Sequence, residues 1–339
     1  MRKLMSRLSL IVVLTVTAFI GLTARNAHAA AKATYTVIVG TDTPYGLESL
    51  IFSPQTLKVH RGDTVTWQFR GFHNVRFDQK NLDILADNDI DGKKLPELNP
   101  QILFPNAKGG DVFKAGINTG IPLAGPNVEP FSLVMDVEPG TYSYVCDVHP
   151  GMVGSIVVVE DSVQIPSPDE VDKASQAEIA SALADGERGY LDALKKFSAP
   201  PTNGTLQVAD GIQENLTSVN LFFPSTATIQ TGTTVNWTVP KGFNIHTVNL
   251  PLAKEGRVDA FTFMLDSKKT PHAVFSDAGV ANVKSGDELP ADGVAKSGIL
   301  APGQSFALKF TKPGVYAYYC AIHPDQFGIL EVVPPQPQP

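Results

Sequence analysis

One segment of this chain occurs twice and contains every cysteine in the sequence. The first copy reads Tyr142-Ser-Tyr-Val-Cys146-Asp-Val-His149-Pro-Gly-Met152, and the second reads Tyr316-Ala-Tyr-Tyr-Cys320-Ala-Ile-His323-Pro-Asp-Gln326. Each copy follows a Pro-Gly pair that is typical of a turn between strands. The chain must therefore fold so that the same Cys-x-x-His loop forms in two places.

The residue types in these loops predict a metal site. A thiolate, an imidazole and a thioether in Cys-x-x-His-x-x-Met spacing form a compact set of soft ligands, which suits copper. One more imidazole from a distant strand would complete each set, and a histidine stands 73 residues before Cys146 and 74 before Cys320. The predicted ligands are His73, Cys146, His149 and Met152 at the first site, and His246, Cys320, His323 and Gln326 at the second.

Simpler interpretations of these residues exist. The two cysteines could form a disulfide that ties the halves of the chain together, but a disulfide does not require a histidine three residues after each cysteine. Gln326 could face solvent in a turn, and the second site would then have three ligands or hold zinc. His60 and His272 each align with a glutamine in the other copy, so neither is predicted to be a ligand that both sites share.

The duplication extends well beyond the loops. Residues 56–67 align with 226–237, and each stretch ends in a tryptophan, Trp67 or Trp237, that we expect in the core. Short β-branched and aromatic runs bounded by Gly or Pro predict antiparallel sandwiches. The predicted strands are 37–39, 64–69, 131–134, 141–146 and 155–159 in the first half, and 206–208, 234–239, 305–310, 315–320 and 328–333 in the second.

The segment between the halves has a different composition. Prolines begin and end residues 162–203, and the interior is rich in Ala, Glu, Leu and Lys. The apolar residues Val171, Ala174, Ile179, Leu183, Leu191 and Leu194 roughly follow a helical period. We therefore predict a helical linker over 169–197 that packs on a domain, with Gly186 as the point where it would break. Residues 334–339 form a Pro/Gln tail that we expect to be disordered.

The N-terminus is typical of an export signal. Basic residues, an apolar stretch over 8–22 and an Ala-x-Ala motif at 27–29 predict a signal peptide over residues 1–29. The alternative, a membrane anchor, would need a longer apolar stretch, and no other apolar run is long enough to span a membrane. Cleavage removes four basic residues and takes the formal net charge from −7 to −11. This acidic balance argues against nucleic acid as a partner.

Both halves resemble cupredoxins, the blue copper protein family. The loop from Cys146 to Met152 looks like that of amicyanin and plastocyanin, and His73-Asn74-Val75 resembles their upstream ligand motif. The resemblance implies an all-β fold, with Greek-key β-sandwich domains at 30–161 and 204–333, and a type 1 copper centre in each. The second half departs from the first at Gln326, which stellacyanin-like members also carry, and at Thr247, so its hydrogen bonding near the metal is expected to differ. Each half also has a long insertion before its Cys loop, within which 100–104 and 271–275 correspond.

The resemblance implies an exported, periplasmic or extracellular electron carrier with a redox partner protein rather than an enzyme. An oxygen ligand from Gln326 should favour Cu(II) more than the Met152 sulfur does, so we expect the second site to donate electrons to the first. Copper sequestration or delivery is an alternative. A multicopper oxidase or nitrite reductase is a weaker one, because the sequence has no His-x-His pair and few histidines remain after the predicted ligands are assigned.

Overall fold

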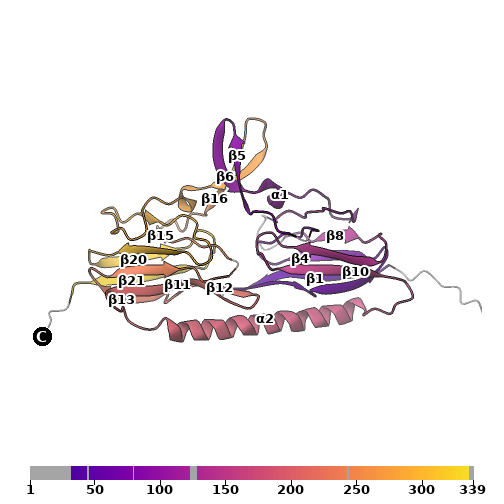
Figure 1. Cartoon of the computed structure of the whole chain (residues 1–339), viewed down its shortest axis with the longest axis horizontal. Helices are drawn as coiled ribbons and strands as arrows, with labels where there is room; N and C mark the ends of the chain where they lie inside the picture. Colours follow the sequence, from indigo (N-terminus) through magenta and orange to yellow (C-terminus); the bar gives the residue numbers. More distant parts are fainter. Residues whose placement is uncertain (1–31, 44–45, 79, 123–127, 243, 336–339) are drawn as a thin grey trace, which may run out of the picture. The chain divides into compact units, whose positions relative to one another are not determined.

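The computed structural model describes residues 32–43, 46–78, 80–122, 128–242 and 244–335, most of which lie in strands or the loops between them (Figure 1). The predicted signal peptide and all but the first two residues of the predicted tail lie outside these ranges. The first repeat begins with β1 (Thr34–Asp42), β2 (Leu47–Ser53), β3 (Thr56–His60) and β4 (Thr64–Phe69), and ends with β8 (Phe131–Val134), β9 (Gly140–Val145) and β10 (Val153–Val159). The second has β11 (Thr205–Glu214), β12 (Thr217–Phe223), β13 (Thr226–Gln230), β14 (Thr234–Thr238), β19 (Ser305–Lys309), β20 (Gly314–Tyr319) and β21 (Phe327–Val333).

The predicted all-β class with two sandwich domains is confirmed. In each repeat, a Trp-bearing strand pairs in parallel with the first strand, and the Cys loop follows a strand of the facing sheet. Side chains from the two layers form a separate core in each repeat. Trp67 and Trp237 are fully buried at the centres of these cores, as expected, and each contacts a tyrosine from the strand before the Cys loop, Tyr144 or Tyr318.

A single nine-stranded sheet runs through both repeats, which the sequence did not predict. Its order is β19-β14-β11-β12-β2-β1-β4-β8-β7, where β7 is the short strand Asp111–Val112. The repeats join where β2 pairs antiparallel with β12, with Thr217 opposite Ser49 and Val219 opposite Leu47. We call this β2–β12 junction the seam. Each sandwich is completed by its own second sheet, β3-β10-β9 in the first repeat and β13-β21-β20-β15-β18 in the second, which includes β15 (Asn249–Leu250) and β18 (Ala295–Lys296).

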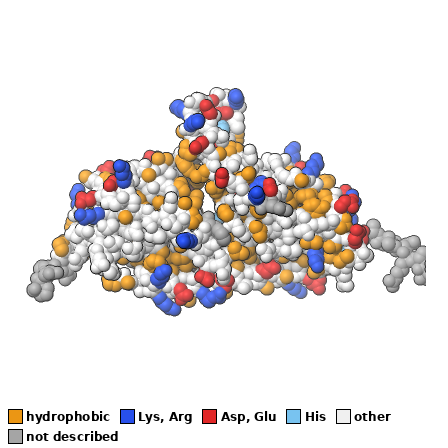
Figure 2. Space-filling model, viewed as in Figure 1, with side chains coloured by type: hydrophobic (Ala, Val, Ile, Leu, Met, Phe, Trp, Pro, Cys, Tyr) orange, Lys and Arg blue, Asp and Glu red, His pale blue; other side chains and the backbone are white. Residues whose placement is uncertain are grey.

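The segment between the repeats forms one helix, α2 (Pro168–Lys196), which packs on strands of both repeats (Figure 1). It begins with a capping box in which the Ser167 side chain and Glu170 satisfy each other's backbone N–H groups. The predicted break at Gly186 is wrong, because the helix continues through a buried Gly186. The predicted apolar stripe is only partly right, since Leu191 and Leu194 are exposed while Tyr190 and Ala193 pack inward. Figure 2 shows acidic and basic side chains interspersed where α2 runs.

The two insertions form a further small sheet together. β5 (Leu85–Ile90) and β6 (Lys93–Leu98) come from the first repeat, and β16 (Phe261–Leu265) and β17 (Pro271–Phe275) from the second. The sheet has the order β16-β17-β6-β5, so β6 and β17 link the repeats. The predicted correspondence within the insertions is wrong, because residues 100–103 form the short helix α1 (Pro100–Leu103), whereas 271–275 form β17.

A contact between a histidine and a buried carboxylate supports this junction between the insertions. His272 Nδ1 lies 2.8 Å from Glu97 Oε2, and the Glu97 side chain has no exposed surface. After β17 in the sequence, η1 (Asp277–Gly279) is a short 3-10 turn of the second insertion. Within the part of the chain that the structure describes, no helix has the length and apolar character needed to cross a membrane.

Candidate metal centres

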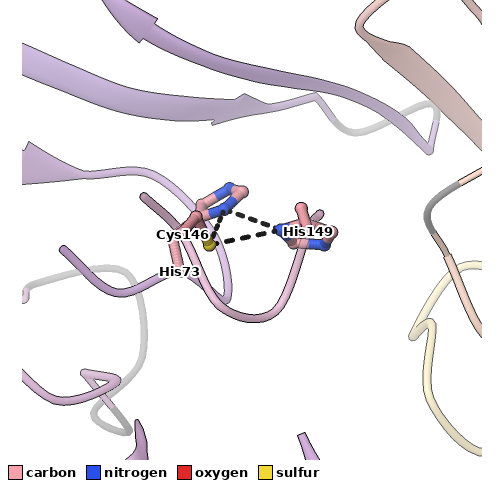
Figure 3. A group of neighbouring side chains, drawn as sticks. All are labelled: His73, Cys146 and His149. Atoms are coloured by element: carbon pink, nitrogen blue, oxygen red, sulfur yellow. Dashed lines mark hydrogen bonds between the residues drawn. The ribbon is translucent and has the colours of Figure 1, made fainter. Parts of the chain in front are cut away.

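Three of the four predicted ligands of the first site, His73, Cys146 and His149, meet in the interior of the first repeat (Figure 3). Cys146 Sγ lies 3.7 Å from His73 Nδ1 and 3.7 Å from His149 Nδ1, and the two Nδ1 atoms are 3.0 Å apart. His73 follows the Trp67 strand β4, whereas Cys146 and His149 lie in the loop between β9 and β10. All three side chains are at most 5% exposed, so the chain buries three ligand atoms in one small triangle.

This triangle has the size that a metal ion requires. Sides of 3.7, 3.7 and 3.0 Å place its centre about 2 Å from each ligand atom, close to usual metal–nitrogen and metal–sulfur distances. Three such atoms around one centre form a trigonal His₂Cys set, which is the geometry of blue copper sites. The donor set and its dimensions therefore fit copper.

Burial keeps both imidazoles neutral and so available as ligands. It lowers the pKa of His149 to about 3, and burial together with the His149 ring lowers the pKa of His73 well below its ordinary value. Burial also raises the pKa of the Cys146 thiol to about 12, because a thiolate without a nearby cation is unfavourable in the interior. A bound metal ion would supply that positive charge and displace the thiol proton.

The second site repeats this arrangement. His246, Cys320 and His323 have ligand atoms that all lie within 4.8 Å of one another, and Cys320 Sγ lies 3.6 Å from His323 Nδ1. Burial lowers the pKa of His246 to about 4 and raises that of Cys320 to about 11. The described residues contain two such clusters, one in each repeat, and each contains the three His and Cys ligands that the sequence predicts.

The residues predicted to be axial ligands close the same loop in both repeats. The backbone N–H of Cys146 donates to Met152 O at 3.0 Å, and that of Cys320 donates to Gln326 O at 2.9 Å. Both side chains are buried, at 1% exposure each. Gln326 Oε1 lies 2.8 Å from His246 Nδ1, so this amide points into the cluster rather than into solvent.

The residue after the upstream histidine fixes the Cys loop by different chemistry in the two repeats. In the first, Asn74 Oδ1 accepts a hydrogen bond from the backbone N–H of Asp147 at 2.8 Å. In the second, Thr247 Oγ1 accepts from the backbone N–H of Ala321 at 2.7 Å, and the same hydroxyl lies 3.8 Å from Cys320 Sγ. The expected difference in hydrogen bonding is therefore found. In both repeats, however, the bond fixes the backbone of the residue directly after the cysteine.

The insertions hold the Cys loops from outside. In the first repeat, Asn81 Nδ2 donates to Cys146 O at 2.6 Å, and the buried Asp147 carboxylate accepts two hydrogen bonds from Arg76, at 2.7 and 2.8 Å. In the second, Arg257 Nη1 donates to Ala321 O at 2.9 Å. Sequence reasoning gave the insertions no role, and these contacts show that they support the loops.

Two glycines beside the upstream histidines were also missed. Gly40 and Gly211 lie at bulges in β1 and β11, with φ of +67° and +77°. A Cβ at Gly40 would come 2.1 Å from His73 Nε2, and one at Gly211 would come 2.6 Å from His246 Nε2. The sequence does contain a glycine after the first predicted strand of each repeat. The role of this glycine could not be inferred from the sequence, because it depends on where the histidine ring lies.

The simpler alternatives for the cysteines and the remaining histidines are not supported. Cys146 and Cys320 are free thiols in separate cores, so the disulfide is absent. His60 Nε2 lies 2.9 Å from Val163 O, and His272 pairs with Glu97. Neither histidine belongs to a metal-binding cluster among the residues that the structure describes.

Both Cys loops border one cavity of about 700 Å³. Its lining includes His149 and Pro150 from the first repeat and His323 and Pro324 from the second. A chain of polar contacts also crosses the nearby seam. Glu48 Oε1 lies 3.4 Å from His73 Nε2, Asn220 Nδ2 donates to Glu48 Oε2 at 3.1 Å, and Asn244 Nδ2 donates to Asn220 Oδ1 at 3.0 Å. The surroundings of the two clusters are therefore connected.

Comparisons with known proteins agree with this geometry. The pattern of the family described as copper binding proteins, plastocyanin/azurin family, matches residues 41–159 and 219–333. A plastocyanin from Synechococcus sp. (strain JA-2-3B'a(2-13)) is 30% identical over 132 residues, which cover 38% of this chain and 76% of that protein.

Solved structures of similar proteins each cover one part of the chain. A mutant amicyanin in its Cu(I) form is 16% identical, with a TM-score of 0.24, over 39% of this chain and 86% of its own. A purple cupredoxin from Nitrosopumilus maritimus is 21% identical, with a TM-score of 0.22, over 38% of this chain and 98% of its own. Since the family pattern matches both repeats and covers more than half of the sequence, the chain belongs to the plastocyanin/azurin family of copper-binding proteins.

Proposed function

We propose that this protein carries electrons through two type 1 copper centres. The first is held by His73, Cys146 and His149 with Met152 as the axial ligand, and the second by His246, Cys320 and His323 with Gln326 as the axial ligand. The observation that supports this best is the pair of clusters, each with two imidazoles and one thiol and all buried except the partly exposed His323. Copper in such a site would supply a one-electron redox couple, and a ligand set held by strands and hydrogen bonds would change little between the two oxidation states.

The second centre donates electrons to the first in this proposal. The amide oxygen of Gln326 favours Cu(II), whereas the Met152 sulfur favours Cu(I), so the second centre has the lower potential. The cavity that His149 and His323 both line supports exchange within one chain. Equal reduction potentials at the two centres, measured by titration of the loaded protein, would contradict this direction of transfer.

The protein works outside the cytoplasm in this proposal. The N-terminal sequence directs export, and a redox partner protein exchanges electrons with the loaded chain in the periplasm or the extracellular space. The isolated protein would be expected to lack residues 1–29, and N-terminal sequencing of protein from an expressing cell tests this directly.

The test of the function is the visible spectrum of the copper-loaded protein together with the copper content per chain. We expect an intense thiolate-to-copper band and two coppers per chain. Cys146→Ser and Cys320→Ser should each remove one copper and part of the band. A band with one copper that survives in Cys320→Ser would limit electron transfer to the first repeat, and the absence of a band would contradict the proposal.

A further inference from the structure

The second repeat buries a carboxylate where the first repeat has a core valine. Val37 lies opposite Trp67, and Val208 lies opposite Trp237, so these two valines are equivalent. Two residues further along the strands, Val39 in β1 is equivalent to Asp210 in β11, and these residues pair with Phe52 and Phe222, respectively. Neither Val39 nor Asp210 has exposed surface. A buried carboxylate is unfavourable unless it is paired, so Asp210 calls for an explanation.

The contacts of Asp210 lead directly to the second candidate metal centre. Asp210 Oδ1 accepts a hydrogen bond from Gln326 Nε2 at 2.8 Å and lies 3.4 Å from His246 Nδ1. The other oxygen, Oδ2, is buried and has no hydrogen-bond partner among the described residues. The carboxyl group therefore contacts two members of the proposed ligand set, and it has no Lys or Arg partner among the described residues.

This hydrogen bond determines which end of the Gln326 amide faces the metal position. In the structure, the amide presents its NH₂ group to Asp210 Oδ1, which accepts the hydrogen bond. Burial raises the pKa of the Asp210 carboxyl well above its ordinary value, and Oδ1 can accept in either protonation state because the other oxygen can hold the proton. The amide oxygen then faces the cluster, where Gln326 Oε1 lies 2.8 Å from His246 Nδ1. Without Asp210, the amide could turn and present its NH₂ group, which cannot act as a ligand, to the metal.

We propose that Asp210 is a positioning residue that holds the amide oxygen of Gln326 toward the metal. This inference rests on the proposed function, because it requires a metal at the second centre. It defines two matched pairs, Asp210 with Gln326 and Val39 with Met152. A thioether has no donor and no orientation to fix, so a valine is sufficient beside it.

The test is a double-mutant cycle at the second centre, with Asp210→Val, Gln326→Met and the two combined. Asp210→Val alone should weaken Cu(II) binding at this centre by about 10- to 100-fold, the usual effect of losing a partner that orients a ligand. It should also raise the reduction potential. In the Gln326→Met background, the same Asp210→Val change should have little effect on Cu(II) affinity, since no amide remains to be oriented. Equal effects in both backgrounds would overturn the proposal.

Asp210→Asn keeps an acceptor oxygen at this position but removes the carboxyl group. The asparagine oxygen can still accept from Gln326 Nε2, so binding should weaken less than in Asp210→Val. An effect of Asp210→Asn on affinity as large as that of Asp210→Val would contradict the orienting role. In the first centre, Val39→Asp should lower Cu(II) affinity less when Met152→Gln is also present, and the absence of this coupling would count against the matched pairs.

A measurement on the metal-free protein distinguishes failure of this inference from failure of the proposed function. The side-chain amide of Gln326 should give a shifted, slowly exchanging pair of ¹H–¹⁵N resonances, which move toward ordinary values in Asp210→Val. If these resonances do not respond, the role of Asp210 is wrong even when copper binds. If they respond but the unmodified chain binds no metal at the second centre, the proposed function fails there and the inference fails with it.

Discussion

At the scale of single residues, each centre combines neutral imidazoles with a protonated thiol. Burial lowers the pKa of His149 to about 3 and that of His246 to about 4, whereas it raises the pKa of Cys146 to about 12 and that of Cys320 to about 11. At neutral pH the rings therefore hold no extra proton, and each thiol keeps its proton until a metal arrives. At the first centre, metal binding therefore requires the loss of one proton, from the Cys146 thiol.

This difference predicts how metal binding depends on pH. In the Cys320→Ser protein, between about pH 6 and pH 9, a divalent ion bound at the first centre should release one proton, from the thiol alone, because the imidazoles have none to lose. Affinity should then rise about tenfold per pH unit over this range. Calorimetry with Co²⁺, which does not oxidise thiols, in buffers of different ionisation enthalpy would count the protons. Release of two or three protons per ion would mean that the rings are charged in the metal-free protein.

Gly211 allows a second prediction at this scale. A Cβ at this position would come 2.6 Å from His246 Nε2, so Gly211→Ala should displace the ring and abolish copper binding at the second centre alone. Gly293 is a matched control, because it has the same φ of +77° and a Cβ added there would meet no described atom within 4 Å. Gly293→Ala should cost only the backbone strain of about 1 kcal/mol in unfolding free energy and leave two coppers bound. Two coppers in Gly211→Ala would show that the ring has room to move.

At the scale of elements, local patterns predicted the strands well and their partners poorly. The predicted ranges 64–69 and 131–134 match β4 and β8, because β-branched and aromatic residues alternate there between turn residues. The three-residue ligand clusters followed from the loop spacing and one upstream histidine per repeat. The insertions were not predictable, since β6 and β17 pair across a large sequence separation and β6 carries charged residues of both signs. Asp210 was missed because its sequence neighbours give no sign that its side chain reaches Gln326.

Gly186 illustrates how an element's context reverses an intrinsic preference. In an isolated helix, Gly186→Ala would stabilise the helical state by about 1 kcal/mol. In this protein, the added Cβ would lie 2.5 Å from Thr217 Cγ2 on the seam strand β12, and Thr217 Oγ1 already donates to Ala182 O at 2.7 Å. We therefore expect Gly186→Ala to lower the unfolding free energy by about 1–3 kcal/mol, as overpacking does.

Urea unfolding of the metal-free protein would measure this effect. Glu187→Ala, on the exposed face of the same turn, provides the control and should change the unfolding free energy by less than about 0.5 kcal/mol. A more stable Gly186→Ala protein would mean that α2 can move away from the sheet without loss.

At the scale of the whole described chain, three separate junctions tie the repeats together. The seam makes one sheet of both, α2 packs on strands of both, and the insertions pair through β6 and β17 around the buried Glu97–His272 contact. Each junction buries apolar side chains whose exposure to water would be unfavourable, such as Leu47 and Val219 at the seam, Ala193 of α2, and Leu98 and Ala273 between the insertions. Independent unfolding of one repeat would expose all three junctions at once.

The chain should therefore unfold as one cooperative unit. In a Cys320→Ser protein loaded with one copper at the first centre, binding stabilises only the folded state of the first repeat directly. If the repeats are coupled, calorimetry should show a single transition that moves upward as a whole when copper is added. The Cys146→Ser protein, loaded at the second centre, is the matched control and should behave in the same way. Two separate transitions, of which one keeps the same midpoint temperature when copper is added, would show that the seam, α2 and the insertion sheet do not couple the repeats.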